Sequence, residues 1–126
     1  MLIVAYRTAA TPKLIEQVRA RAAQGECSFT LLVPRPYWDP DTEAAAITLE
    51  LAIPLLEEAT GGRVEGIVGG TDPFDAVREM LERGEFDEVI ISTLPERVSR
   101  WLRLDLPHRV QKLGVPVTVV TADSRR

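Results

Sequence analysis

The sequence predicts an α/β fold, a three-layer α/β/α sandwich around a five-stranded parallel sheet. Two observations lead to this prediction. Five short apolar runs alternate along the chain with longer segments in which apolar residues recur at helical spacing. The runs also lack the polar and apolar alternation of a half-exposed strand, so both of their faces should be covered. Parallel strands need crossover connections, and the intervening helices supply them.

The length of 126 residues, with 45% hydrophobic and 27% charged residues, is that of one domain. A chain of this size buries enough surface to fold without a disulfide or a structural metal. We therefore expect a single domain at 1–122, followed by a frayed C-terminal tail at 123–126.

The predicted strands are apolar runs that end at polar residues, glycine or proline. They are expected at Leu2–Tyr6, Cys27–Val33, Val64–Val68, Val89–Ile91 and Val115–Val120. Pro116 has no N–H group to donate, so the last strand should lie at the sheet edge or begin at this residue. An uncovered apolar edge promotes association, and we expect a homodimer that covers it through Val115, Val117 and Val119.

The first two helices follow from capping residues and spacing. Thr11 is expected to cap the first helix, with Pro12 in its first turn and Gly25 at its end. Its buried face should hold Leu14, Ile15, Val18 and Ala22, and its water-facing side Lys13, Glu16 and Arg21. The second helix is expected at Thr42–Thr60, and Pro54 should kink it. Its four-residue spacing is carried by Ile47, Leu51 and Leu55.

The remaining helices show similar start signals. Asp72 should cap a helix that begins at Pro73 and ends at Gly84. Its buried stripe is expected to contain Phe74, Val77 and Leu81. The segment 95–113 has a helical pattern but contains Pro107, which divides it in two. We expect a short helix through Trp101 and Leu104, and a second one that starts near Asp105.

Composition excludes several function classes. Cys27 is the only cysteine and His108 the only histidine, so an internal disulfide, a thiolate zinc site and a cluster of histidine ligands cannot form. We expect no metal, and we expect His108 on a helix surface and Cys27 as a small apolar residue. The formal charge of −4, without blocks of like charge, argues against nucleic acid as a partner. With no secretory segment or long apolar run, we expect a cytoplasmic protein without a membrane partner.

A ligand is expected where the carboxyl ends of the strands meet, because open parallel sheets bind ligands there. Candidate ligand residues lie at or after the ends of the first four strands. They are Arg7, Thr8, Val33, Arg35, Gly69, Gly70, Ser92, Thr93, Ser99 and Arg100. These residues offer hydroxyl and guanidinium groups for an anion but no acid–base pair, so no catalytic residue is expected. The loop residues Tyr37 and Trp38 fit either a lid or partner patch, or a cap over the end of the sheet.

Three segments resemble the universal stress protein family. Val68–Val77 is similar to the junction between strand, glycine, proline and helix in that family. The segments Phe86–Ser92 and Gly114–Val120 look like its closing strands. The resemblance covers nearly the whole chain. It implies the strand order 3-2-1-4-5, a nucleotide crevice between the first and fourth strands, and a homodimer formed through the last strand.

The chain departs from the nucleotide-binding members after the fourth strand. Those members carry a Gly-x-x-Gly pattern there, followed by a further glycine with Ser or Thr, whose backbone amides wrap phosphates. No glycine lies between Gly84 and Gly114 in this chain, and Pro95 removes an amide donor. Arg7 stands where an acidic residue is common. This departure argues against standard ATP binding, while Ser92, Thr93, Ser99 and Arg100 remain as groups that could hold an anion.

Three hypotheses for function follow. The first is a dimeric regulatory protein, similar to universal stress proteins, that binds an anionic small molecule or nucleotide near Arg7 and Ser92. The second is a ligand-free interaction module with a vestigial nucleotide crevice. The third is a nucleotide hydrolase or transferase, which the missing base, metal cluster and phosphate loop disfavour. No cofactor is firmly implied.

Overall fold

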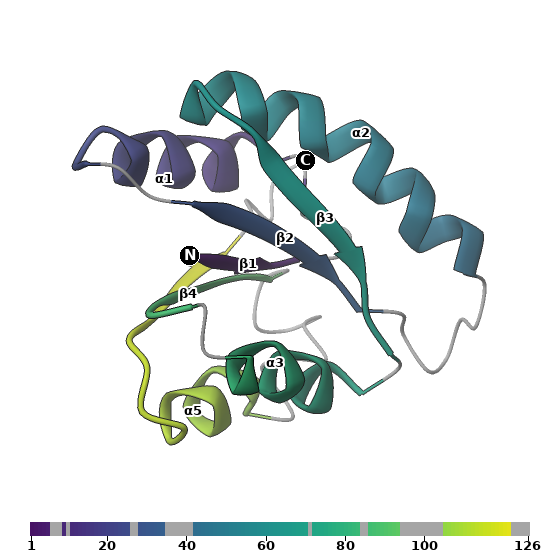
Figure 1. Cartoon of the computed structure of the whole chain (residues 1–126), viewed down its shortest axis with the longest axis vertical. Coiled ribbons are helices and arrows are strands. Elements are labelled where there is room, and N and C mark those ends of the chain that lie inside the picture. Colours follow the sequence, from purple (N-terminus) through teal and green to yellow (C-terminus); the bar gives the residue numbers. More distant parts are fainter. Residues whose placement is uncertain are drawn as a thin grey trace.

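Five parallel strands in the order β3-β2-β1-β4-β5 form the sheet of the computed structural model, with helices on both faces (Figure 1). The structure describes residues 1–5, 9, 11–25, 28–34, 42–70, 72–83, 86–93 and 105–121, with only the backbone at 42–45. The strands are β1 (Leu2–Val4), β2 (Phe29–Val33), β3 (Val64–Val68), β4 (Val89–Thr93) and β5 (Val117–Thr121). The described helices are α1 (Pro12–Ala22), α2 (Thr42–Thr60), α3 (Pro73–Glu82) and α5 (Leu106–Gln111). The predicted fold class and strand order are confirmed.

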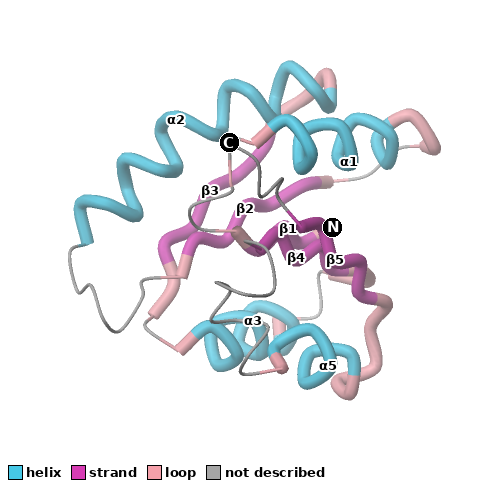
Figure 2. The backbone as a smooth tube through the Cα atoms, turned by 180° about the vertical axis from the view of Figure 1, so that it is seen from behind, coloured by secondary structure: helices cyan, strands magenta, loops and turns pink. Residues whose placement is uncertain are grey.

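Each face of the sheet has its own apolar core. Ile3 and Leu31 point toward α1 and α2, where they pack with Leu14 and Leu56. Leu2, one residue earlier in β1, points to the opposite face, which α3 and α5 cover. Figure 2 shows the two helical layers from behind, with the strands between them. This arrangement explains the continuous apolar runs, because alternate side chains of a central strand enter different cores.

The register aligns the carboxyl ends of the strands. Val4 of β1 lies opposite Leu32 of β2 and Ile91 of β4. The Ala5 N–H donates to the Leu32 carbonyl at 3.2 Å, so the pairing of β1 with β2 continues past the end of β1. Because all strands are parallel, their last residues lie at one edge of the sheet. We call it the carboxyl edge.

Most of the predicted helix signals are confirmed, but one charged side chain of α1 does not face water as expected. Leu14 and Val18 of α1 are buried, and the N–H of Ile15 donates to the Thr11 carbonyl at 3.1 Å. Arg21 was expected to face water, but its Nε donates to the Glu88 carboxylate at 2.7 Å and its side chain is only 25% exposed. The reason is tertiary, since α1 ends beside the residue that precedes β4. The ion pair therefore joins α1 to the start of β4, which are distant in sequence.

Helix α2 differs from the simplest interpretation of its spacing. The helix is continuous through Pro54. Its buried residues are Ala52, Leu56 and Ala59, whereas the residues spaced four apart face outward. These exposed residues are Ile47, Leu51 and Leu55. Apolar residues surround much of this helix, so spacing alone leaves its rotation open.

The boundaries of the last elements also differ from the expectations. Ser92 and Thr93 belong to β4 rather than to the loop after it, because β5 pairs with them at Val120 and Thr121. β5 begins directly after Pro116 and lies at the sheet edge, as expected. Helix α5 starts after Asp105, which adopts a left-handed conformation with φ 59°. The expected helix through Trp101 and Leu104, and the predictions for Cys27, Tyr37 and Trp38, lie outside the described residues.

No helix among the described residues is long and apolar enough to cross a membrane.

Candidate functional site

The direction of the chain across the sheet reverses between β1 and β4. From β1 the chain proceeds outward to β2 and β3, then crosses back to β4 on the other side of β1 and ends at β5. The helices α1 and α5, which come after β1 and β4 in the chain, lie on opposite faces of the sheet. A crevice forms at such a reversal in open α/β sheets, and ligands bind there. The candidate site is the carboxyl edge around the ends of β1 and β4.

Two buried hydroxyl residues end β4. Ser92 is 1% exposed and Thr93 is 3% exposed. By strand alternation, Ser92 shares the face of Ile90, toward α1 and α2, and Thr93 shares the face of Ile91, toward α3 and α5. The two hydroxyl groups therefore lie on opposite sides of the sheet. A ligand above the end of β4 therefore meets the Ser92 hydroxyl on one face of the sheet or the Thr93 hydroxyl on the other. It can contact both residues together only through their backbone.

Two glycines with different surroundings follow β3. Gly69 continues the pairing with β2, because its N–H donates to the Val33 carbonyl at 2.9 Å. A Cβ atom at Gly69 would lie 3.0 Å from both the Ala76 Cβ and the Leu32 Cδ1, so this glycine permits close packing of strand and helix. A Cβ atom at Gly70 would meet no atom within 4 Å. Gly69 is thus a packing residue, whereas Gly70 borders open space at the carboxyl edge.

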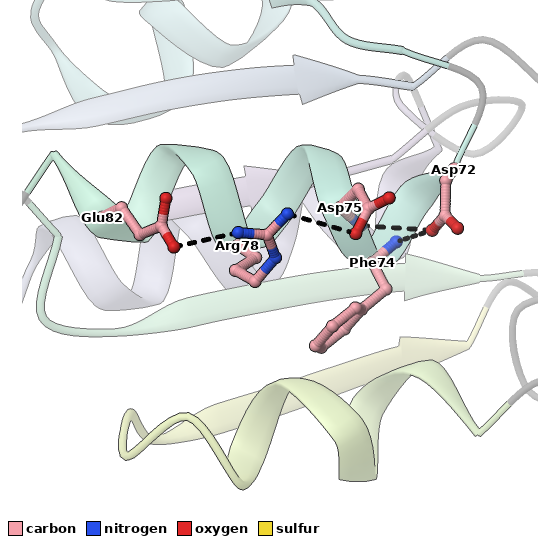
Figure 3. A network of polar contacts seen from close by, with 5 residues as sticks. All are labelled: Asp72, Phe74, Asp75, Arg78 and Glu82. Carbon is pink, nitrogen blue, oxygen red and sulfur yellow. Dashed lines mark hydrogen bonds and ion pairs between the residues drawn. The ribbon is translucent and has the colours of Figure 1, made fainter.

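Helix α3 begins at this edge, and Asp72 occupies its N-terminus (Figure 3). The Asp72 Oδ1 accepts hydrogen bonds from the N–H groups of Phe74 at 2.9 Å and Asp75 at 3.1 Å. Pro73 has no N–H group to offer. A helix N-terminus often binds phosphate through such amides, but here a carboxylate already accepts two of them. The start of α3 is therefore negatively charged and poorly suited to an anion.

The rest of α3 is held by charge pairs and by α5. Figure 3 shows Arg78 between Glu82 and Asp75, with N–O distances of 2.9 and 3.4 Å. The hydrogen bonds to Glu82 and then Asp75 raise the pKa of Arg78 above its ordinary value. The guanidinium of Arg109 in α5 lies 4.3 Å from the centre of the Phe74 ring. The ion pairs of Arg78 lie within α3, whereas the contact of Arg109 with Phe74 joins α3 to α5.

The ends of β3 and β4 can be compared through the register of the sheet. Val33 pairs with Val68 and Leu32 with Ile67, while Val4 aligns Leu32 with Ile91. Val33 and Val68 are therefore level with Ser92, the residue after Ile91. The next residues, Gly69 and Thr93, are level with each other. Three strand spacings separate β3 from β4, so Gly69 and Thr93 are roughly 14 Å apart. This span suits an elongated ligand with chemically different ends.

The predicted site residues are only partly described. Val33 is fully buried and contributes its carbonyl to Gly69, and Gly69, Gly70, Ser92 and Thr93 lie at the carboxyl edge. The other predicted ligand residues lie outside the described residues; they are Arg7, Thr8, Arg35, Ser99 and Arg100. The local sequence does not distinguish Gly69 from Gly70, since the difference depends on Leu32 and Ala76. It predicts the Asp72 cap but not the effect of that carboxylate on a bound anion.

The other sequence predictions concern His108, metals and the β5 edge. His108 is exposed on α5, as expected, and its Nδ1 lies 3.1 Å from the Asp105 carboxylate. Within the described part of the chain, no three His, Cys, Asp or Glu side chains are grouped to hold a metal ion. Val115 and Val117 are half-buried against the core beside α3 and α5, and Val119 is exposed.

Comparisons with known proteins bear on the fold. The sequence matches no protein-family model and no curated protein. A structure of a universal stress protein in complex with cAMP is similar, with a TM-score of 0.68, 15% identity and 98% of both chains covered. A universal stress protein from Archaeoglobus fulgidus has a TM-score of 0.67 and 16% identity, with 94% of this chain and 90% of that chain covered.

A third similar structure, of the Archaeoglobus fulgidus protein in complex with dAMP, has a TM-score of 0.66 and 15% identity, and 94% of both chains are covered. The coverage leaves no large part of the chain without a counterpart. The chain therefore has the fold of the universal stress proteins.

Proposed function

We propose that this protein is a divergent universal stress protein that binds an adenine mononucleotide and acts by binding rather than by catalysis. The observation that carries the proposal is the reversal of the chain between β1 and β4, with Ser92 and Thr93 at the end of β4. Two proteins of the same fold are described in complex with cAMP and dAMP, which supports an adenine nucleotide as the ligand class.

The charges at the carboxyl edge suggest an orientation for the nucleotide. The Asp72 carboxylate would repel a phosphate beside Gly70, whereas the open space at Gly70 suits an uncharged base. We place the phosphate near the end of β4, where Ser92 and Thr93 lie. Five further residues are proposed to complete the site; they are Arg7, Thr8, Arg35, Ser99 and Arg100. Guanidinium groups would take over the role of the missing glycine amides toward the phosphate.

The experiment is a thermal unfolding assay with cAMP, dAMP, ATP, adenosine and inorganic phosphate. A ligand that binds only the native state raises its stability by about 2.7 kcal/mol at a hundred times its Kd. We expect cAMP and dAMP to raise the Tm by several degrees, adenosine to raise it less, and ATP to raise it least of the nucleotides. No shift with any nucleotide would reject the proposal in favour of an interaction module without a ligand.

Arginine variants test where the phosphate binds. Arg7→Gln and Arg100→Gln should each weaken cAMP binding about tenfold and leave adenosine binding unchanged. The matched control is Arg63→Gln, because Arg63 is exposed and precedes β3, at the opposite edge of the sheet. Equal cAMP affinity in all three variants would contradict an arginine-lined phosphate site. Turnover of ATP or cAMP by the wild-type protein, lost in a Ser92→Ala variant, would instead establish a nucleotide hydrolase or transferase.

We also propose a cytoplasmic homodimer formed through β5. The strand lies at the sheet edge, and its Val119 is 42% exposed. A second copy paired along this edge would cover Val119 and the unpaired side of the strand. Val119→Lys should therefore convert a dimer to a monomer in analytical ultracentrifugation, whereas Glu65→Lys serves as the control, because Glu65 is exposed on β3 at the opposite edge of the sheet. A monomeric wild-type protein would reject this part of the proposal.

A further inference from the structure

Three large apolar side chains form an exposed stripe along α2. Ile47 is 52% exposed, Leu51 65% and Leu55 43%. They recur every four residues, which places them on one side of the helix over two turns. Exposed apolar residues are common singly, but a contiguous row on one helix is typical of an interaction surface. We call these three residues the α2 stripe.

The packing of α2 on the sheet keeps the stripe outward. Ala52 and Leu56 are fully buried in the core beside α1. On another side of the helix, Leu49 and Ile53 pack over Gly66 of β3. A Cβ atom at Gly66 would lie 3.0 Å from the Leu49 Cδ2 and 3.2 Å from the Ile53 Cδ1. The helix is thus seated close to β3, and rotating the stripe inward would remove both sets of contacts.

The charges of α2 are of one sign. Thr42–Thr60 contains four glutamates and neither lysine nor arginine. Glu50 and Glu58 are exposed beside the stripe, whereas the Glu57 carboxylate accepts the N–H of Val64 at 3.0 Å. Pro54 adds an acceptor, because it has no N–H group for the Glu50 carbonyl four residues earlier. The α2 stripe thus lies beside carboxylates and the Glu50 carbonyl. A partner with both apolar and cationic groups would complement this surface.

We propose that the α2 stripe binds a basic amphipathic helix of another protein. Such a helix inserts apolar side chains spaced three or four residues apart against the stripe, while lysine or arginine side chains on its flanks meet Glu50 and Glu58. A second copy of this chain is a poorer occupant, since two α2 helices would bring their glutamates together. The three side chains also offer much less surface for burial than the roughly 800 Å² that each partner buries in a stable dimer.

The test uses three synthetic peptides of about 18 residues, five helical turns. One carries leucines spaced four apart with flanking lysines, the second has glutamate in place of each lysine, and the third has serine in place of each leucine. Binding to the full chain is measured by isothermal titration calorimetry. We expect the leucine–lysine peptide to bind at least tenfold more tightly than either of the other two.

Variants locate the binding surface. Leu51→Gln should weaken binding of the leucine–lysine peptide about tenfold, and Glu50→Gln with Glu58→Gln should weaken it and reduce its salt dependence. Leu113→Gln is the control, because Leu113 is 41% exposed and lies outside α2. Unchanged unfolding of each variant shows that it folds. Equal binding by Leu51→Gln and the wild type, or by the three peptides, would overturn the proposal.

Ultracentrifugation covers the alternative occupant. A wild-type dimer that Leu51→Gln dissociates would show that a second copy covers the stripe, and would overturn the proposal as stated. The inference does not depend on the nucleotide site. Loss of nucleotide binding in the arginine variants therefore leaves peptide binding intact, and the failure of either proposal can be recognised separately.

Discussion

A Cβ atom at Gly69 would lie 3.0 Å from the Cβ atom of Ala76, so the end of β3 and the first turns of α3 approach as closely as a side-chain-free residue permits. This contact seats α3 against the sheet directly after the turn that borders the candidate site. The next residue, Gly70, has no such neighbour. The two adjacent glycines therefore differ in how closely their surroundings pack.

We predict that Gly69→Ala destabilises the protein and that Gly70→Ala does not. The added methyl group at Gly69 must displace Ala76 and Leu32, an overpacking that costs about 1–3 kcal/mol. At Gly70 the methyl group enters open space, so the free energy of unfolding should change by less than about 0.5 kcal/mol. Urea unfolding of both variants measures this difference. Equal stability of the two variants would contradict the packing role of Gly69.

The same pair separates folding from ligand binding. If the base of a nucleotide occupies the space beside Gly70, Gly70→Val should weaken cAMP and adenosine binding to a similar extent without loss of fold. Calorimetric titration of both ligands provides the measurement. Unchanged affinity for both would place the base elsewhere along the carboxyl edge.

We predict that Asp72→Ala lowers the free energy of unfolding by about 1 kcal/mol, because the N–H groups of Phe74 and Asp75 lose their acceptor. Asp72→Asn keeps a side-chain acceptor at the same position and should cost only a few tenths of that value. Denaturant unfolding compares the two variants. A strong gain in cAMP affinity in Asp72→Asn, with adenosine unaffected, would show that the phosphate lies at this end and would reverse our orientation of the nucleotide.

The ion pair between Arg21 and Glu88 should contribute measurably to stability. Both side chains are about three-quarters buried, with exposed fractions of 25% and 26%, so Glu88→Gln is expected to cost about 1 kcal/mol. The control is Glu82→Gln, which removes an exposed pair with Arg78 and should cost less than about 0.5 kcal/mol. Unfolding at low and high salt measures both. An equal effect of the two substitutions would show that burial adds nothing to the Arg21 pair.

Two leucines of α2 test the rotation of that helix. Leu56→Ala removes a fully buried side chain and should cost about 2–5 kcal/mol. Leu51→Ala shortens a side chain that is 65% exposed and should change the free energy of unfolding by less than about 0.5 kcal/mol. Thermal or urea unfolding distinguishes them. Comparable losses would mean that the α2 stripe is covered in solution.

Local chemistry explains which features the sequence could predict. The Asp72 cap and Pro73 act on amides within the same helical turn, so the start of α3 was predicted correctly. The strand order was inferred from similarity of Val68–Val77 and the closing strands to a known family, and the structure confirms it. The expectation of a ligand at the carboxyl edge follows from the parallel sheet, and the strand order adds where the chain reverses.

Other features depend on residues far apart in the chain. The segment Ser92–Thr93 was assigned to a loop, but β5 pairs with it and extends β4. Arg21 was expected in water, and Glu88 lies 67 residues later in sequence. No local sequence pattern predicts these contacts.

The α/β class, the positions of the strands and most helix starts follow from local sequence, because hydrophobic periodicity, capping and proline act over a few residues. The rotation of α2, the different surroundings of Gly69 and Gly70, and the partner of Arg21 depend on tertiary contacts. Each of these depends on which distant surfaces meet when the sheet is assembled. In α2, where apolar residues lie on several sides, the close approach to Gly66 and the burial of Leu56 leave Leu51 in water.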